Sequence, residues 1–367
     1  MYKITIIAGA RPNFMKIAPI VHAIEKAKQE NVAIDYRLVH TGQHYDKNMS
    51  GSFFEQLEIP EPHINLECRG GSQAEQTADI MINFEKELMG HPADLVLVVG
   101  DVTSTMACAL VAQKLNTKVA HVEGGIRSDD WSMPEEINRL VTDSITNYFF
   151  TTSETANTNL RQSGVKDDQI FFVGNTMIDT LLKQRPKFKQ PKVWNQLGLT
   201  TGNYIVMTLH RPANVDEESQ LKDMINEIVK NTKDLPLIFP VHPRTAKIFE
   251  RLKISHSRLH TVDPLSYLEF NYLVENAKAV ITDSGGITEE ASVMRIPCLT
   301  LRDNTERPET IALGTNELVG TNPKQLKHYL DLLFSGQWKK GQDIPLWDGK
   351  TAIRIIDHLK RMTTPMV

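Results

Sequence analysis

Residues 93–125 read ADLVLVVGDVTSTMACALVAQKLNTKVAHVEGG and contain one complete strand-helix-strand unit. The two apolar runs at 95–99 and 118–122 are rich in β-branched residues and have the length of buried parallel strands. Between them, residues 102–117 carry apolar side chains at helical spacing and end at Asn116-Thr117, a plausible helix stop. A strand, a helix and a strand in this order predict a right-handed crossover within a parallel sheet.

Similar apolar runs occur on both sides of this unit. The other predicted strands are KITIIAG, DYRLVH, NYFFTT, YIVMTLH, PLIFPVH, KAVITDS and IPCLTL. A polar segment with Pro and Gly, KQPKVWNQLGLTTGN at 189–203, interrupts the series once. We therefore predict an α/β protein of two Rossmann-like doubly wound domains with a central cleft. The domains are expected at 1–174 and 175–367, with the final helix, about 350–367, packing back on the first domain.

Composition narrows the class of protein. A chain of 367 residues with 41% apolar and 23% charged residues is typical of a globular protein with two domains. The net charge of -4, without a cluster of basic residues, argues against nucleic acid as a partner. Neither a signal peptide nor a membrane span is recognisable, so we expect no membrane partner. Three cysteines without CxxC spacing favour a reducing cytoplasm over a disulfide framework or a zinc site.

The first predicted strand ends in a turn suited to an anion. Gly9-Ala10-Arg11-Pro12 leads into a helix that contains Lys16, and a helix amino terminus favours negative charge. A plain strand-helix turn with solvated cations is the alternative. The chain contains neither GxGxxG nor GxxxxGK[ST], which argues against a dehydrogenase or a kinase. Histidines at 40/44 and 256/260 share no predicted helix, so we expect no metal site.

Three acidic residues lie at the edge of the sheet where a ligand is expected. Asp101 and Glu123 end predicted strands, and Glu135 follows Pro134 at the start of a predicted helix. Asp101 alternatively caps the next helix, and Glu135 alternatively interacts with a helix dipole. Glu123 has no comparable structural explanation, because a carboxylate between an apolar strand and two glycines is costly to bury. The sequence therefore predicts a site that uses several carboxylates.

The second half of the chain places basic residues and glycines after its predicted strands. His210-Arg211 and His242-Pro243-Arg244 both end predicted strands. This position favours anion binding or proton transfer over a purely structural role. The strand KAVITDS runs into Ser284, Gly285 and Gly286 at a helix start, where glycines permit close approach of a pyrophosphate.

Acidic and basic residues further along the second half complete this predicted site. Glu290, about one turn along the helix, is placed to accept hydrogen bonds from the ribose hydroxyls. The alternative is that Glu290 is an acidic residue on the helix surface. The string LRDNTERPE brings Arg302, Arg307 and Glu309 together, either for a phosphate or as a solvated turn.

Eight strings of the sequence, taken in order, resemble one enzyme family. They are GARPNFMK, HTGQH, GDVTST, HVEGGIR, PEEINR, MTLHRP, DSGGITEEA and RDNTERPE. Together they are similar to the non-hydrolysing UDP-N-acetylglucosamine 2-epimerases over nearly the whole chain. The resemblance implies a fold similar to GT-B glycosyltransferases and a homodimer. It also implies interconversion of UDP-N-acetylglucosamine and UDP-N-acetylmannosamine, with a UDP-sugar as substrate and no cofactor.

The implied reaction removes a hydrogen that is not acidic by itself, because carbon 2 is not next to a ketone. Expelling UDP from carbon 1 gives an oxocarbenium-like centre that acidifies this hydrogen, and its loss yields a 2-acetamidoglucal. Reprotonation from the opposite face and re-addition of UDP complete the inversion. The route requires cations for the departing diphosphate and acid-base groups on both faces of the sugar.

The resemblance also implies roles for individual residues. The acid-base and sugar-positioning residues are Asp101, Glu123, Glu135 and His210. The diphosphate is held by Arg11, Lys16, Ser284, Gly285, Gly286 and Arg307. Glu290 holds the ribose, and Phe270 borders the uracil or belongs to the core. Gln43 and His44 correspond to a site that is allosteric in some bacterial members.

Two strings depart from the usual family pattern. Many members have GTRPEAIK and HRREN where this chain has GARPNFMK and HRPAN. Arg11, Lys16 and His210 are retained, but Pro212-Ala213 replaces the second arginine after the histidine. The sequence therefore does not decide which UDP-sugar is the substrate. The alternatives are a 2-epimerase of a related UDP-N-acetylated uronic acid, a hydrolysing 2-epimerase, a glycosyltransferase of similar fold and a non-catalytic sensor.

Overall fold

The structure is a computed structural model. It describes residues 1–42, 54–68, 70–210, 218–241, 248–249, 251 and 254–363. The chain forms two compact units, Met1–Thr180 with Pro345–Val367, and Leu181–Ile344. The sequence expectation set the boundary at residue 174, whereas the first unit continues to Thr180 and takes up the chain again at Pro345.

The first unit contains a seven-stranded sheet with the order β3-β2-β1-β4-β5-β6-β7, and all its strand pairs are parallel. Its central strands are apolar and fully buried, as parallel strands covered on both faces must be. The strands are β1 (Tyr2–Ala8), β2 (Ile34–His40), β3 (Ile64–Asn65), β4 (Leu95–Val99), β5 (Lys118–Val122), β6 (Tyr148–Thr151) and β7 (Ile170–Phe172).

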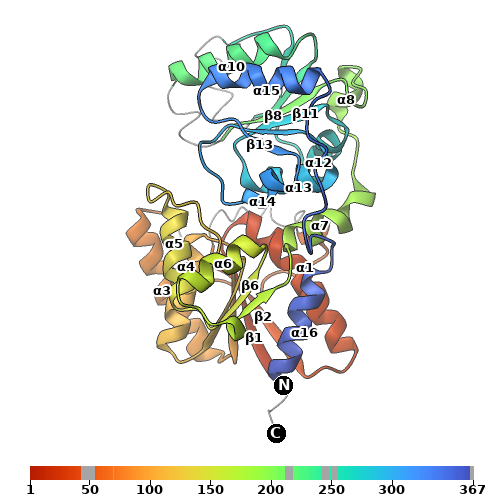
Figure 1. The fold of residues 1–367 in the computed structure, drawn as a ribbon. Coiled ribbons are helices and arrows are strands. Elements are labelled where there is room, and N and C mark those ends of the chain that lie inside the picture. Colours follow the sequence, from red (N-terminus) through yellow and green to blue (C-terminus); the bar gives the residue numbers. More distant parts are fainter. Residues whose placement is uncertain are drawn as a thin grey trace. The chain divides into compact units, whose positions relative to one another are not determined.

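Helices connect these strands, as the spacing of apolar residues predicts (Figure 1). They are α1 (Arg11–Gln29), α3 (Gln73–Gly90), α4 (Thr103–Lys114), α5 (Pro134–Ser144), α6 (Glu154–Gln162), α7 (Thr176–Gln184) and α16 (Thr351–Thr363), with the 3-10 turn η1 (Asp167–Gln169). Small residues such as Ala107, Cys108 and Ala112 let α4 approach the sheet, α3 and α5 closely. The last helix, α16, packs against α1 (Figure 1).

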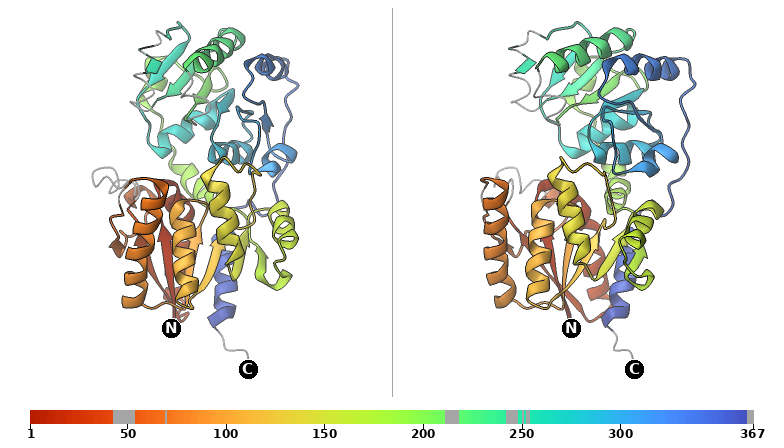
Figure 2. Two further views of the ribbon diagram at one scale, coloured as in Figure 1. Left: turned by 90° about the vertical axis from the view of Figure 1, so that its left-hand side faces the viewer. Right: turned by 60° about the vertical axis from the view of Figure 1, so that its left-hand side comes forward.

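The second unit repeats this architecture with a six-stranded parallel sheet of order β10-β9-β8-β11-β12-β13 (Figure 2). The strands are β8 (Ile205–Thr208), β9 (Leu237–Pro240), β10 (Leu259–Val262), β11 (Ala279–Thr282), β12 (Cys298–Thr300) and β13 (Asn316–Leu318). The helical segments are η2 (Arg185–Lys187), α8 (Lys192–Gln196), α10 (Glu218–Asn231), α12 (Tyr267–Asn276), α13 (Gly285–Met294), α14 (Pro308–Ala312) and α15 (Pro323–Phe334). The predicted fold class of two doubly wound parallel-sheet domains is confirmed.

Each sheet has one point at which the strand order reverses direction. In the first sheet β1 lies between β2 and β4, and in the second β8 lies between β9 and β11. Doubly wound sheets bind ligands beyond the carboxyl ends of the strands at this point. The segments that follow β1, β4 and β5, and those that follow β8 and β11, therefore define the candidate site in each unit.

Candidate active site

The turn after β1 is fixed against the end of β4. The side-chain oxygen of Asn13 accepts hydrogen bonds from the backbone N–H groups of Gly9 at 3.1 Å and Ala10 at 3.0 Å. Its Nδ2 donates to the carbonyl of Val99 at 3.1 Å. Gly9 is needed because a Cβ at this position would lie 2.5 Å from Ser104 Oγ. The start of α1 is thereby held at the edge of the sheet where a ligand is expected.

Lys16 and Glu123 form a buried ion pair at the same edge. Lys16 Nζ lies 2.7 Å from Glu123 Oε2, and the two side chains are 15% and 3% exposed. Glu123 follows β5 with a φ of 73°, a left-handed conformation that costs energy for a residue with a side chain. Gly100, after β4, leaves space for the pair, since a Cβ there would lie 3.1 Å from Lys16 Nζ. The structure thus brings together two residues that the sequence analysis assigned to different tasks.

Arg139 on α5 joins two carboxylates. Its Nε and Nη2 donate to Asp101 Oδ2 at 3.1 and 2.6 Å, and its Nη1 donates to Glu136 Oε2 at 2.6 Å. Glu136 also accepts from the backbone N–H groups of Ser128 at 2.9 Å and Asp129 at 3.1 Å. Burial would raise the pKa of Glu136, but these hydrogen bonds and Arg139 hold the pKa below its ordinary value. The Asp101 side chain stays 32% exposed and accessible to a ligand.

Two acids are adjacent at the start of α5, and they differ in burial. Glu135, the predicted catalytic residue, is only partly buried, whereas Glu136 is 1% exposed. Neither Glu136 nor Arg139 was predicted from the sequence to belong to the site. Glu136 and Arg139 are three residues apart on a predicted helix, and residues at this spacing are neighbours on the helix surface. This spacing could have indicated that the two side chains form an ion pair.

A second buried network lies behind these carboxylates, and the sequence analysis also missed it. His121 Nε2 donates to the carbonyl of Gly100 at 2.8 Å, and Nδ1 lies 2.8 Å from Asp143 Oδ1. Asp143 also accepts from the backbone N–H of Gly125 at 3.0 Å and from Arg127 Nη1 at 2.6 Å. Burial would raise the pKa of Asp143, but His121 and Arg127 hold it below its ordinary value. The network ties together the turns that carry Asp101 and Glu123.

In the second unit, His210 follows β8 and Asp283 follows the neighbouring strand β11. The backbone N–H of His210 donates to both carboxylate oxygens of Asp283, at 3.2 and 3.0 Å. The Nδ1 of His210 lies 2.7 Å from Asp283 Oδ1, and the side chains are 62% and 0% exposed. Asp283 thus contacts Nδ1, and Nε2 is the ring nitrogen that does not contact this carboxylate.

The amino terminus of α13 directly follows this pair. Ser284 is the N-cap, and Gly285 and Gly286 are the first helical residues. Among the described residues, a Cβ at Gly285 would meet only Glu306 Oε2 at 3.9 Å and Arg302 Nη1 at 4.0 Å. The backbone at the helix start is therefore open, and its N–H groups together with the helix dipole favour an anion.

Glu290 lies one turn further along α13 and is 4% exposed. Tyr267 on α12 donates from its hydroxyl to Glu290 Oε1 at 2.6 Å. Burial raises the pKa of Glu290 to about 7, although the bond from Tyr267 opposes part of this shift. The predicted phosphate ligand Arg307 forms an ion pair with Glu289, and both side chains are buried.

The remaining predicted residues have the following positions. Arg11 is the first residue of α1, and Phe270 lies on α12, where it is partly exposed. The candidate allosteric residues Gln43 and His44 lie outside the described residues, and so does the segment 242–244.

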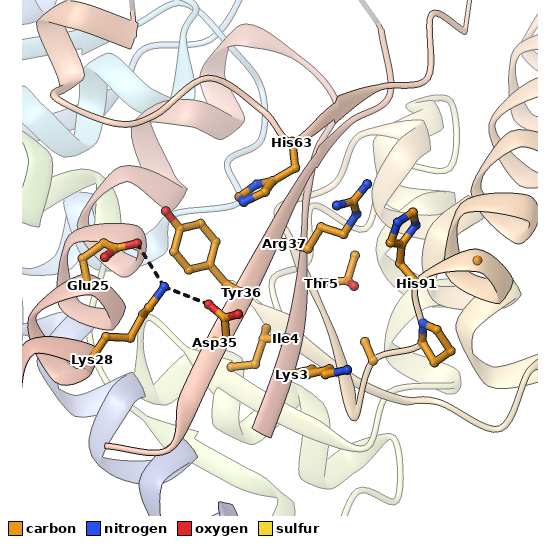
Figure 3. A pocket seen from close by; sticks show the side chains of 13 residues that line it. Lys3, Ile4, Thr5, Glu25, Lys28, Asp35, Tyr36, Arg37, His63 and His91 are labelled. Carbon is orange, nitrogen blue, oxygen red and sulfur yellow. Dashed lines mark hydrogen bonds and ion pairs between the residues drawn. The ribbon is translucent and has the colours of Figure 1, made fainter. Parts of the chain in front are cut away.

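A separate pocket of about 500 Å³ lies in the first unit at the amino-terminal halves of β1 and β2 (Figure 3). Two of the cations that line it are ion-paired: Lys28 Nζ lies 2.8 Å from Asp35 Oδ1, another lining residue, and Arg37 Nε lies 2.5 Å from Oε1 of Glu87, which lies outside the lining. The pocket is at the opposite ends of the strands from Asp101 and Glu123, so it does not belong to the candidate site.

The described part of the chain contains neither a metal-binding cluster nor a membrane-spanning helix. There, no group of three or more His, Cys, Asp or Glu side chains is arranged to hold a metal ion. Among the described helices, none is both long and apolar enough to cross a bilayer.

Known proteins provide an independent comparison. The family model for UDP-N-acetylglucosamine 2-epimerase matches residues 26–360. A UDP-N-acetylglucosamine 2-epimerase of Methanocaldococcus jannaschii is 41% identical over 367 residues, covering 96% of this chain and 98% of the relative. A UDP-2,3-diacetamido-2,3-dideoxy-D-glucuronate 2-epimerase of Pseudomonas aeruginosa is 39% identical over 324 residues, covering 87% of this chain and 88% of the relative.

Solved structures agree with the sequence comparison. The crystal structure of the Methanocaldococcus jannaschii enzyme in complex with UDP-GlcNAc and UDP matches with a TM-score of 0.87 at 40% identity, covering 98% of this chain and 99% of that chain. The family model extends through both units, and so do the relatives. The chain therefore belongs to the UDP-N-acetylglucosamine 2-epimerase family.

Proposed function

We propose that this protein interconverts UDP-N-acetylglucosamine and UDP-N-acetylmannosamine by inverting carbon 2. The family match over residues 26–360 carries the proposal. UDP leaves carbon 1, the hydrogen on carbon 2 is removed, and the 2-acetamidoglucal is reprotonated from the other face before UDP adds again. The enzyme is thus an isomerase that needs acid-base groups and a diphosphate site.

The first unit supports the acid-base part of this reaction. Asp101, Glu123 and Glu135 lie at the carboxyl edge of the sheet or at the start of α5, and we assign them to proton transfer and sugar positioning. Lys16 lies 2.7 Å from Glu123 and places a positive charge beside this carboxylate. We also assign Lys16, with Arg11, to the diphosphate.

The second unit supports the nucleotide part. The open helix start at Ser284, Gly285 and Gly286 is suited to a diphosphate, and Glu290 is one turn away for the ribose. We assign Arg307 to the diphosphate and Phe270 to the border of the uracil. His210, held through Nδ1 by Asp283, joins the acid-base residues.

Deuterium exchange tests this proposal directly. The purified protein is incubated with UDP-N-acetylglucosamine in heavy water and the sugar is followed by proton NMR. We expect deuterium at carbon 2 and a mannosamine epimer that is still linked to UDP, with no added cofactor. Absence of exchange at carbon 2 would disprove the proposal, and release of free N-acetylmannosamine would identify a hydrolysing enzyme instead.

A second candidate function is 2-epimerisation of a UDP-linked diacetamido uronic acid. It is favoured by the 39% identity to the Pseudomonas aeruginosa enzyme that carries this name. Parallel assays with the two UDP-sugars decide between them. We expect a kcat/KM at least about tenfold higher for UDP-N-acetylglucosamine, a preference worth about 1.4 kcal/mol. The reverse order would establish the uronic acid as the substrate.

The proposed function also suggests an oligomeric state and a cellular compartment for the protein. We propose a homodimer, which light scattering of the purified protein measures directly. We also propose that the enzyme works in the cytoplasm. The free, buried state of Cys68, Cys108 and Cys298 supports a reducing compartment.

A further inference from the structure

Glu290 differs from the other buried carboxylates of the candidate site. Glu123 and Glu136 are ion-paired with lysine or arginine at 2.7 and 2.6 Å. Glu290 is equally buried, yet its hydrogen bond comes from the neutral hydroxyl of Tyr267 at 2.6 Å. Within the described residues, Glu290 takes part in no ion pair. A charge in this position is therefore poorly compensated, and the site favours the neutral acid.

A second observation points to a ligand at the same place. Asn271 lies one turn after Tyr267 on α12, so the two side chains share a face of the helix. Asn271 is 0% exposed and near enough to Glu290 to favour the charged form of that carboxylate, but among the described residues neither its Oδ1 nor its Nδ2 makes a hydrogen bond of ordinary geometry. Leaving such a group unsatisfied is costly in free energy, because its lost hydration is not replaced. An amide held in this state beside Glu290 is typical of a site that a polar ligand completes.

Three groups besides burial act on the charge of Glu290. Tyr267 and Asn271 on α12 favour the charged form, and Glu289 on the same helix disfavours it. Arg307, at the start of α14, pairs with Glu289. Burial is the largest influence and raises the pKa of Glu290 to about 7. Neutral and charged forms are consequently close in free energy near neutral pH.

We propose that Tyr267 and Glu290 form a proton-linked clamp for the ribose, in which Tyr267 positions Glu290 and substrate binding expels the proton of Glu290 into solvent. This inference rests on the proposed function, which brings a UDP-sugar to the start of α13. Ribose hydroxyls are hydrogen-bond donors, and a carboxylate accepts them with both oxygens, whereas a carboxylic acid uses one oxygen for its own proton. Only the O–H bond of Glu290 breaks, and the proton leaves with solvent.

The sign of the pH dependence follows from this scheme. The neutral acid dominates below its pKa of about 7, so the clamp must lose a proton before it binds the diol. KM for UDP-N-acetylglucosamine should therefore rise as the pH falls, approaching about tenfold per pH unit well below that value. Above it, KM should be constant. The kcat should not carry this dependence, because the clamp is formed in both the bound substrate and the transition state.

Titration calorimetry in buffers of different ionisation enthalpy measures how many protons are released when the substrate binds. Epimerisation is proton-neutral overall, so any proton released on mixing the enzyme with UDP-N-acetylglucosamine reports binding. At pH 7 we expect release of about half a proton per wild-type site, in accordance with the pKa of Glu290. Glu290→Gln should abolish the release and raise KM at every pH.

Tyr267→Phe separates positioning from a structural role. Loss of the hydroxyl removes a bond that favours the carboxylate, so proton release at pH 7 should grow toward one. KM should rise several-fold at pH 7 and return toward the wild-type value when the pH is raised to about 8.5. Damage to packing alone would leave KM high at both pH values.

Tyr204→Phe is the matched control. The Tyr204 hydroxyl is also buried and donates to the carbonyl of Leu273 on the same helix at 2.6 Å, but it does not contact Glu290. This variant should release the wild-type number of protons. Turnover without proton release in the wild type, or a KM of Tyr267→Phe that raised pH does not restore, would overturn the clamp. Absence of any exchange at carbon 2 would instead overturn the proposed function.

Discussion

In the first unit, Glu123 and Glu136 are buried beside Lys16 and Arg139, whereas in the second unit Glu290 is buried beside a tyrosine. Hydrogen bonds from Ser128 and Arg139 offset the cost of burying Glu136 and hold its pKa below the ordinary value. Glu290 lacks that compensation and has a pKa of about 7. The two units thus stabilise buried carboxylates in different ways: the first pairs them with cations, and the second leaves Glu290 beside a neutral hydroxyl.

The largest effect should follow from removing the cation that Asp101 and Glu136 share. Arg139→Met leaves Glu136 buried without its partner, which should lower the free energy of unfolding by about 3–5 kcal/mol in urea titrations. Arg161→Met, which breaks the exposed pair with Asp167, should cost less than about 1 kcal/mol. Equal losses in the two variants would mean that burial does not distinguish these ion pairs.

Acid should reduce the penalty of Arg139→Met. The pKa of Glu136 is held below its ordinary value, so its contribution to stability is present above that value and is lost as the pH falls through the lowered pKa. The difference between wild type and variant should therefore shrink once Glu136 is protonated.

The next effect concerns catalysis without loss of the fold. Glu123→Gln preserves shape but removes the proposed acid-base group, and turnover should fall about 100-fold with little change in melting temperature. Glu87→Gln, at the partly buried pair with Arg37 away from the candidate site, is the control and should retain turnover. Equal turnover of Glu123→Gln and wild type would make Glu123 structural.

A smaller effect is expected where glycine makes room for the Lys16–Glu123 pair. Gly100 and Gly164 both have positive φ, at 70° and 87°, so alanine should strain either position by about 1 kcal/mol. A Cβ at Gly100 meets Lys16 Nζ at 3.1 Å, whereas one at Gly164 meets nothing within 4 Å. Turnover should therefore drop about tenfold in Gly100→Ala only. A similar drop in Gly164→Ala would trace the loss to backbone strain.

The smallest effect is expected at the start of α13, the proposed diphosphate site. Gly285→Ala should be tolerated by the protein, because the added Cβ approaches only Glu306 and Arg302 at 3.9 and 4.0 Å. A diphosphate at the helix start would meet the methyl group, so KM should rise several-fold at unchanged kcat. Gly90→Ala, at the end of α3 in open space, should leave KM unchanged. An unaltered KM in Gly285→Ala would show that the diphosphate does not bind at this helix start.

The fold was largely predictable because long apolar strands such as β1 and β4 leave a clear pattern. The strands β3, β7 and β13 were missed, and each has only two or three residues at the edge of its sheet. Runs of this length carry no periodicity that separates them from loops.

The candidate site was predictable only in part. Residues that follow strands, such as Glu123 and His210, are located by strand position alone. Their partners are not: Asp143 and Arg139 come from a helix face, and Tyr267 reaches Glu290 from another helix. These contacts depend on how elements distant in sequence pack together, which no local pattern encodes.

The return of α16 to the first unit has a consequence for synthesis of the chain. Because α16 packs on α1, the surface of α1 stays uncovered while the ribosome makes all of Leu181–Ile344. The second unit has its own sheet and core, so it can fold before the first unit is complete. The first unit can therefore be completed only after the whole second unit has been synthesised.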